Sequence, residues 1–468
     1  MANKSLLTYG AKVSAVEQAY YFPSVVLPYA TNTNLGTLYA FLANTLPWED
    51  DANPPIPTQD QKNIKLIMKN IFVVKKITSG DISPVVQRVD WTSNTVYDYY
   101  QDDVDMLERD TNGNLVRNFY VKNRYDQVFK CLWNNNGGLS TVEPYFEPGT
   151  YGTNNIYQGV DNYKWKYIYT IDTGLKVKFM DETWMPIPIG ANTPNPEQSN
   201  AGAGSIDVIN IIDGGTGYDA ANSVIKITIE GDGTGAEGSL SLSQIVNGVI
   251  TDATITNPGK NYTFANVIIT GTAANGSSMG AGVVAVCPTS PVGGHGFDPV
   301  SEFGCAHVMF TVQFDKDEGG IIPTDNNYYQ IGLISNPTTK EHPAVPANNT
   351  IYRTTTDLVV SPGFGTYSDD EFVFQVATPG DPISKATFKA TVLSFNTSTN
   401  TVKLINMVGT PTINGSLYGN SSGTTRTLLA VDSPAYSLLS GYLLYVENRS
   451  GVQRSPDGIE QYKFVLGY

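Results

Sequence analysis

The chain has 468 residues, with 29 Lys and Arg against 44 Asp and Glu, which gives a formal net charge of -15 at pH 7. Such acidity argues against a general nucleic-acid-binding protein, because phosphate backbones are bound by clustered positive charge. The length predicts about three domains, with two or four as open alternatives. The 28 tyrosines, together with many Thr, Val, Ile and turn-forming Gly residues, favour a mainly β protein.

The sequence carries no pattern typical of secretion or of membrane spanning. Residues 1–10 contain neither the apolar run nor the small-residue cleavage site of a signal peptide. No stretch approaches the roughly 18 apolar residues of a spanning helix. The cysteines Cys131, Cys287 and Cys305 are odd in number and far apart, which argues against a disulfide framework. We therefore expect a protein made in the cytoplasm, either cytosolic or part of a particle assembled there, with no membrane contact.

Two helices are predicted near the N-terminus. The first covers residues 12–21. The second covers residues 59–71, because Ile64, Ile67, Met68 and Ile71 recur at helical spacing. Thr58 and Gln61 have the spacing of a capping box at its start. The Pro-rich segment 53–57 before it cannot be helical, so we expect an extended strap across the surface.

Strands are predicted along most of the remaining chain. The segments richest in aromatic and β-branched residues are 72–74, 128–133, 165–171, 308–314, 329–334, 443–446 and 462–466. The turn-forming run 134–138 follows the second of them. The last segment is expected to be tied into a sheet rather than to form a loose tail.

A Gly-rich segment near residues 195–286 contains an internal repeat. Gly215-Thr216-Gly217-Tyr218 aligns with Gly259-Lys260-Asn261-Tyr262, and Ala221-Asn222 aligns with Ala265-Asn266 at the same offset. Each unit has a Gly turn, a Tyr and an apolar strand, which is 224–229 in the first unit and 267–270 in the second. One unit alone could not bury its apolar face, so we expect the two to stack into one β module.

The fold predicted is mainly β: a multi-domain antiparallel β-sandwich frame with a few N-terminal helices and two inserted small β modules. A second segment, rich in alternating Thr, Ser and Asn, provides the other insert. The predicted parts in chain order are an N-terminal part of the frame (1–194), the Gly-rich repeat module (195–290), a continuation of the frame (291–370), the second β module (371–432) and C-terminal strands that close the frame (433–468).

Two glycine-rich motifs match functional patterns and are better interpreted as turns. Residues 276–280 fit G-x-S-x-G, but a nucleophile elbow needs a helix after it, and 281–284 has strand composition. Residues 214–219 fit a calcium-binding nonapeptide repeat, but the second copy lacks the Asp. Neither motif therefore predicts a catalytic or calcium site.

The ionisable residues give no further site. The acidic segments 110–114 and 315–320 lack the spacing of a calcium-binding EF-hand loop and are predicted as hairpin turns, and 101–105 is predicted as a solvated acidic face. His295, His307 and His342 have no zinc-ligand spacing, and His307 begins an apolar strand as a structural residue. No phosphate-binding loop occurs. The sequence thus predicts no catalytic, cofactor-binding or metal residues and no cofactor, and it leaves the interface residues open.

Several stretches occur in an order and spacing that indicate a known family. They are Leu46-Pro47-Trp48 with the strap to Thr58, residues 85–91, residues 163–167 with 184–188, residues 329–337 with His342-Pro343, and residues 445–449 with 464–466. Taken together, the chain resembles baseplate wedge protein eight of T-even-like contractile-tailed phages. The resemblance covers roughly residues 1–194, 296–355 and 437–468, and it excludes both predicted inserts.

The resemblance implies a mostly β virion subunit that acts as a rigid building block. Such a subunit forms a homodimer, binds neighbouring wedge subunits in the tail baseplate and has no catalytic residues to transfer to this chain. It would be assembled in the host cytoplasm. Trp48, Trp91, Trp165 and Trp184, which lie in the matching stretches, are expected to be buried anchors.

Two other classes of function remain open. A carbohydrate- or host-surface-binding protein, similar to an adhesin, would use the tyrosines of the Gly-rich module as aromatic platforms. A hydrolase would use Ser278 of the G-x-S-x-G match.

Overall fold

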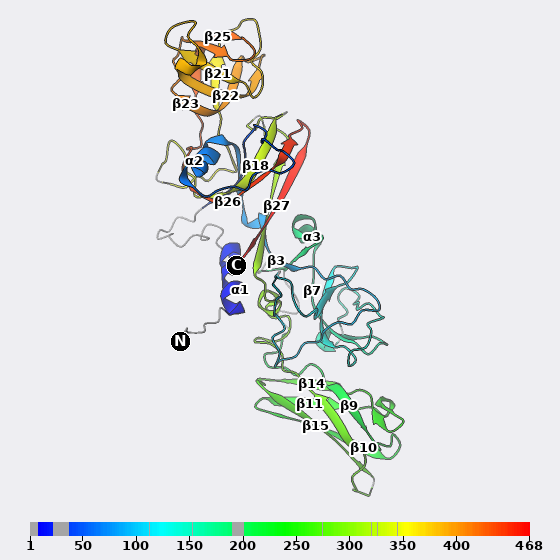
Figure 1. The fold of residues 1–468 in the computed structure, drawn as a ribbon. Coiled ribbons are helices and arrows are strands. Elements are labelled where there is room, and N and C mark those ends of the chain that lie inside the picture. Colours follow the sequence, from blue (N-terminus) through cyan, green and yellow to red (C-terminus); the bar gives the residue numbers. More distant parts are fainter. Residues whose placement is uncertain are drawn as a thin grey trace, which may run out of the picture. The chain divides into compact units, whose positions relative to one another are not determined.

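The computed structural model describes residues 8–21, 37–111, 113–151, 153–189, 201–273, 275–319, 321–324, 326–343 and 345–468. Strand accounts for 44% of the chain and helix for 10%, and several of the sheets are antiparallel (Figure 1). The predicted mainly β class is therefore confirmed. No helix among these residues is both long and apolar enough to cross a lipid bilayer.

The chain divides into two compact units, each built from segments distant in sequence. The first unit comprises Met1–Val16, Ser83–Met309 and Leu466–Tyr468, and the second comprises Glu17–Ile82 and Phe310–Val465. The boundaries fall inside continuous elements, which are α1 (Tyr9–Tyr21), β3 (Ile82–Gln87), β17 (His307–Asp315) and β27 (Ile459–Gly467).

A five-stranded sheet and a short helix form one part of the second unit. Its strands, in spatial order, are β19 (Ile351–Arg353), β2 (Ile71–Ile77), β1 (Leu38–Ala43), β18 (Asn327–Ser335) and β26 (Tyr442–Gln453). Every residue of β1 is buried, which explains its uninterrupted apolar sequence. Helix α2 (Gln61–Asn70) packs Ile67 and Met68 into the core beside Phe41. The predicted helical face is thus confirmed.

The predicted capping box of α2 is wrong. The N-cap is Asp60, whose Oδ1 accepts a hydrogen bond of 2.9 Å from the backbone N–H of Asn63. The Thr58 hydroxyl instead donates to Asp60 Oδ2. A carboxylate at this position satisfies an unpaired backbone donor and also lies favourably at the positive end of the helix dipole.

A closed six-stranded barrel forms the other part of the second unit (Figure 1). Around the barrel the order is β20 (Thr356–Val360), β23 (Thr401–Gly409), β22 (Ala386–Asn396), β21 (Phe372–Val376), β24 (Ser416–Gly419) and β25 (Thr425–Asp432). Its core contains Leu358, Phe388, Val392 and Leu404. Because the barrel is closed, none of its strands has an unpaired edge. The chain enters the barrel once, at β20, and leaves it once, after β25. The barrel begins before residue 371, the predicted start of the second insert.

A four-stranded sheet forms the centre of the first unit. Its order is β4 (Tyr120–Lys122), β5 (Gln127–Trp133), β7 (Lys164–Thr170) and β6 (Ile156–Gln158). One face carries an aromatic core that includes Phe129, Trp165 and Tyr167. Close by in sequence, α3 (Thr173–Phe179) leads to β8 (Trp184–Pro186), which pairs with β3. Further short helices among the described residues are α5 (Pro299–Glu302), η1 (Ser79–Asp81), η2 (Thr153–Asn155), η3 (Leu242–Gln244) and η4 (Ile383–Lys385).

The Gly-rich repeat forms an interleaved module in the first unit. Its strands are β9 (Asn210–Thr216), β10 (Ser223–Gly231), β11 (Thr234–Ser239), β12 (Ile245–Val246), β13 (Val249–Ile250), β14 (Thr254–Lys260), β15 (Ala265–Ala273) and β16 (Ala281–Val286). The first copy, β9 to β11, pairs entirely with the second, β14 to β16: β9 with β16, β10 with β15 and β11 with β14. Each of these two-stranded sheets therefore contains one strand from each copy, so the two copies interleave within one module.

Tyrosine and glycine lock the two copies together. The backbone N–H of Tyr218 donates to Gly248 and that of Tyr262 donates to Gly204, so the repeat extends back to these glycines at the same offset. A Cβ on Gly280 would lie 2.4 Å from the Tyr218 ring, and one on Gly233 would lie 2.4 Å from the Tyr262 ring. Each tyrosine thus packs against backbone of the opposite copy, where only glycine leaves room.

The four tryptophans expected to be anchors differ in burial. Trp165 is fully buried, whereas Trp48, Trp91 and Trp184 are half-buried. Trp48 donates from its indole nitrogen to the carbonyl of Arg449, at 3.0 Å. The prediction of buried anchors is therefore confirmed for Trp165, and the other three tryptophans are only partly buried.

Candidate functional site: a buried lysine face

Four lysines lie on the face of the central sheet opposite its aromatic core. We call Lys122, Lys130, Lys164 and Lys166 the lysine face. Lys130 of β5 is the direct antiparallel partner of Lys166 of β7, and Lys164 lies two residues away on the same strand. Their exposed side-chain fractions range from 1% for Lys130 to 9% for Lys166. Four buried ammonium groups need acidic partners, because an unpaired buried charge is very costly.

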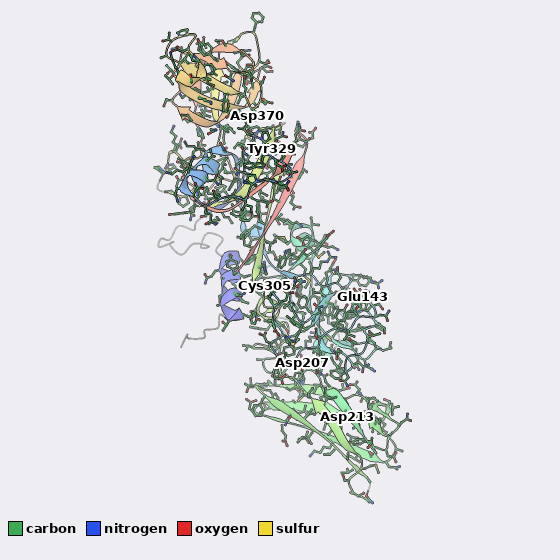
Figure 2. The ribbon with its side chains drawn as sticks, viewed as in Figure 1. Glu143, Asp207, Asp213, Cys305, Tyr329 and Asp370 are labelled. Atoms are coloured by element: carbon green, nitrogen blue, oxygen red, sulfur yellow. The ribbon has the colours of Figure 1, made fainter. Side chains whose placement is uncertain are left out.

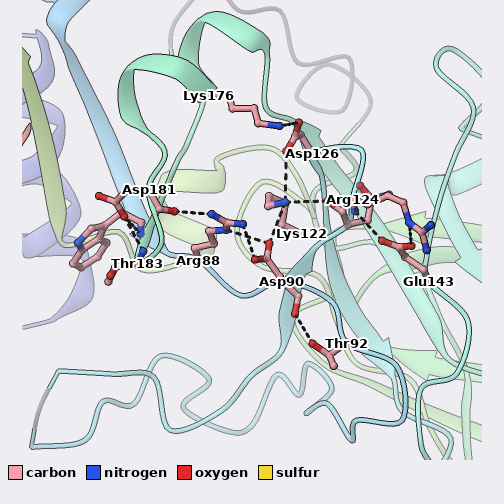
Figure 3. A network of polar contacts seen from close by, with 12 residues as sticks. Arg88, Asp90, Thr92, Lys122, Arg124, Asp126, Glu143, Lys176, Asp181 and Thr183 are labelled. Carbon is pink, nitrogen blue, oxygen red and sulfur yellow. Dashed lines mark hydrogen bonds and ion pairs between the residues drawn. The ribbon is translucent and has the colours of Figure 1, made fainter. Parts of the chain in front are cut away.

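Lys122 belongs to a polar network at one end of the face (Figure 3). Its Nζ lies 3.0 Å from Asp90 Oδ1 and 3.5 Å from Asp126 Oδ1. Lys176 of α3 reaches the other oxygen of Asp126, at 2.7 Å. Arg88 links Asp90 to the backbone carbonyl of Asp181, at 2.8 Å. This network joins β4 to α3 and to the segment before β8, which are distant from β4 in sequence.

Lys164 and Lys166 bind the two copies of the repeat module. Lys164 Nζ lies 2.7 Å from Asp252 Oδ1 and also donates to the carbonyls of Ile209 and Ala253. Lys166 Nζ lies 3.1 Å from Asp207 Oδ2, in a carboxylate labelled in Figure 2. Asp207 follows Gly204, and Asp252 follows the equivalent Gly248. Each repeat copy therefore contributes one carboxylate to a neighbouring lysine of β7.

Lys130 binds the segment that follows the repeat module in the chain, through Glu302 of α5. Its Nζ lies 2.8 Å from Glu302 Oε1, and the two side chains are 1% and 2% exposed. The same oxygen lies 2.8 Å from Nδ1 of His295. Because an ionised carboxylate only accepts hydrogen bonds, Nδ1 of His295 carries the proton. Nζ of Lys130 also lies 3.6 Å from the centroid of the Tyr100 ring, in a cation–π contact.

The protonation of this cluster follows from burial and pairing. Burial by itself raises the pKa of Glu302, but Lys130 and His295 outweigh it and hold the pKa well below its usual value. Burial lowers the pKa of His295, and the positive charge of Lys130 lowers it further, so the imidazole is neutral at pH 7. Burial likewise opposes ionisation of Asp207, yet the neighbouring Lys166 makes its net pKa shift downward. The carboxylates of Glu302 and Asp207 are thus held ionised beside their lysines, although burial lowers the pKa of Lys130 and of Lys164.

A cavity of about 320 Å³ lies beside Lys130 and Glu302. Its other walls include Tyr100, Asp102, Asp105, Phe119, Asp298 and Ser301. Ionisable groups that converge on a cavity are one signal of an active site. Here, however, Lys130 faces a carboxylate and an aromatic ring, Glu302 also accepts from the backbone N–H of Gly296, and Asp102 accepts from Thr289. These contacts hold the charges of Lys130, Glu302 and Asp102 in place.

The structure places a turn at the start of the G-x-S-x-G match, whereas residues 214–216 of the calcium-like motif lie in β9 and not in a turn. Ser277 donates to Asn275, and the strand β16, not a helix, follows the G-x-S-x-G match. At the calcium-like motif, Asp219 accepts from the backbone N–H of Ala221 and from the side chain of Asn222. Asp219 thus caps the short turn that follows the calcium-like motif, and the turn interpretation is confirmed for the G-x-S-x-G match alone.

The acidic segments and the histidines also have structural partners. Asp110 accepts from the backbone N–H of Asn114 and closes the predicted hairpin turn, although Asn112 lies outside the described residues. In the second acidic turn, Glu318 pairs with Lys75. His307 begins β17 with its ring centroid 4.5 Å from that of Trp184, and burial lowers its pKa to about 4.

Sequence reasoning missed the lysine face and its acidic partners. The available signal was the spacing of Lys164 and Lys166, which alternate with Trp165 and Tyr167 in a strand that is otherwise apolar. Alternation places lysines on one face and aromatic residues on the other. The acids that bind them are far away in sequence, so the alternation alone could not identify the partners.

Comparison of the sequence with known protein families and with curated proteins returns no match.

Proposed function

We propose that this chain is a structural subunit of the baseplate wedge of a contractile phage tail, which joins neighbouring wedge proteins and acts through rigid shape. The observation that carries the proposal is the use of the buried charges. Lys164 and Lys166 bind acids of the repeat module and Lys130 binds Glu302 of α5, so ion pairs fasten both the module and α5 to the sheet. A subunit held this way presents a preformed surface and loses little ordering entropy on docking.

The resemblance to a baseplate wedge protein supplies the particular assembly. It rests on residues in both units, including the strap after Trp48 and the strands around Trp165 and Tyr329. In that assembly the chain would form a homodimer, reside in the virion and work without a catalytic step or cofactor. Contraction would move it as a rigid body about its interfaces.

The alternative of a glycan-binding module depended on exposed tyrosines in the repeat module, and the two repeated tyrosines are buried. Tyr218 and Tyr262 are only 4% and 6% exposed, because their rings pack against glycines inside the module. They cannot serve as aromatic platforms for a sugar ring in this arrangement. We therefore do not propose the repeat module as a glycan site.

The test is co-expression with the other tail baseplate proteins of the same phage. We expect a complex that stays together through gel filtration, and light scattering should give the free chain the mass of a dimer. A chain that remains apart from every baseplate protein would refute the proposal. Hydrolysis of ester or glycoside substrates that is lost in Ser278→Ala would instead support an enzyme.

A further inference from the structure

The cavity of about 320 Å³ beside α5 in the first unit has a buried and already paired floor. Lys130 and Glu302, with side chains 1% and 2% exposed, form an ion pair at 2.8 Å, and Phe119 beside them is 1% exposed. We call these three residues the floor of the cavity. Small-molecule pockets have volumes of roughly 300–1,000 Å³ and are largely formed before the ligand binds. The cavity therefore has the size and the fixed floor of such a pocket.

Three carboxylates in the rest of the lining have no cationic partner among the described residues. They belong to Asp102, Asp105 and Asp298. Within the same part of the chain, Asp102 accepts hydrogen bonds only through Oδ2, and Asp298 only through Oδ1, as the N-cap of α5. The nearby Arg117 pairs with Glu108 and reaches only the backbone carbonyl of Asp105. Because the ion pair at the floor is neutral overall, the lining as a whole carries a negative charge.

Apolar side chains share this lining with the carboxylates. Val104, Met106 and Leu107 come from the loop 100–107, and Val292 comes from the turn before α5. Val292 is fully exposed, so its apolar surface lies in water. Covering such a side chain releases water from apolar surface and favours binding. The lining thus suits a ligand that combines positive charge with an apolar body.

We propose that this cavity binds an aliphatic polyamine, whose ammonium groups pair with the three unpaired carboxylates while its methylene chain packs against Met106 and Val292. An anion is disfavoured, because Lys130 is already paired with Glu302. A metal ion is disfavoured as well, since no three acidic, histidine or cysteine side chains among the described residues are grouped closely enough to hold one. An extended organic cation, by contrast, reaches carboxylates that are spread around a cavity.

Several weak contacts combine in such a complex. Each ion pair is partly exposed, so it adds little affinity alone and weakens as the salt concentration rises. The apolar contacts of the methylene chain are not screened in this way. This inference does not depend on the proposed function, because it concerns the isolated chain and a small molecule.

The experiment is isothermal titration calorimetry of the full chain with the diamine cadaverine at physiological salt. Asp298→Asn removes one carboxylate from the lining and keeps α5 capped, since Asn is as good an N-cap as Asp. Asp60→Asn is the matched control, because it makes the same change at the N-cap of α2, in the second unit and outside the cavity lining. Val292→Ser removes apolar contact without changing the charge, at an exposed position that should not disturb folding. Circular dichroism will verify the fold of each variant.

We expect one saturable site in wild type. Asp298→Asn should raise the Kd about fivefold, which is the effect of losing one partly exposed ion pair. Val292→Ser should raise it about threefold through lost apolar burial, and Asp60→Asn should leave it unchanged. Equal weakening by Asp60→Asn would show only general attraction to an acidic chain and would overturn the inference.

Two other results would also overturn it. One is equally tight binding of pentanediol, which has the same carbon chain as cadaverine and no charge. The other is the absence of saturable cadaverine binding in wild type. Neither result bears on complex formation with baseplate proteins, which tests the proposed function separately.

Discussion

Replacing Lys130 by Met would leave a buried carboxylate without its cation. Glu302 is 2% exposed and would keep only its contacts with His295 and the backbone N–H of Gly296. Removing one partner of a buried ion pair costs about 3–5 kcal/mol. Because two donors to Glu302 remain, we expect about 3 kcal/mol, a large part of the roughly 5–15 kcal/mol that stabilises a typical domain.

The assay must report on the first unit alone, because the two units can unfold separately. Native-state hydrogen exchange at backbone amides of β5 and β7 meets this need. The matched control is Lys385→Met. Lys385 pairs with Asp381 at 2.9 Å, but its side chain is 65% exposed, so this substitution should cost less than about 1 kcal/mol.

A double variant and a pH series test whether the unpaired carboxylate of Glu302 causes the loss of stability in Lys130→Met. Adding Glu302→Gln to Lys130→Met removes the unpaired charge and should restore more than about 1 kcal/mol. In the single variant, burial should raise the pKa of Glu302, so its destabilisation should shrink as the pH falls. In wild type, the lowered pKa of Glu302 keeps this stabilisation present above its unfolded pKa and loses it only in stronger acid. Lys130→Met with wild-type protection, or a double variant no better than the single, would refute the reasoning.

Three further predictions follow from burial and backbone conformation. Burial lowers the pKa of His307 to about 4, so its stabilising contribution should be present above pH 6.5 and lost between pH 6.5 and 4; an NMR titration midpoint near 6.5 would contradict this. Gly280→Ala should destabilise the repeat module more than Gly276→Ala. Both glycines have positive φ, but an added Cβ at Gly280 would lie 2.4 Å from the Tyr218 ring, whereas at Gly276 it would meet no atom within 4 Å. Equal hydrogen-exchange protection in the two variants would count against the tyrosine–glycine lock. Leu404→Ala should cost about 2–5 kcal/mol by leaving a cavity in the barrel, and Leu429→Ala, at a side chain 46% exposed, much less; thermal unfolding measures both.

Local sequence determined the type of most elements. The spacing of Ile67 and Met68 predicted α2, and aromatic and β-branched runs predicted β5, β7 and β18, because side-chain periodicity follows directly from backbone geometry. The same reasoning recognised the segment around Ser278 as a turn. The cap of α2 was missed since Asp60 and Thr58 both suit that role, and the choice depends on where the first helical turn begins.

Tertiary structure alone decided how the elements combine. The repeat was visible in the sequence, but nothing local specified that β10 pairs with β15, because strand pairing depends on register and on contacts across the whole module. The lysines of the central sheet were visible as well, yet their acids, Asp207, Asp252 and Glu302, come from distant positions. A buried charge must be paired somewhere, but the fold selects its partner, because only the folded chain brings the two side chains within a few ångströms.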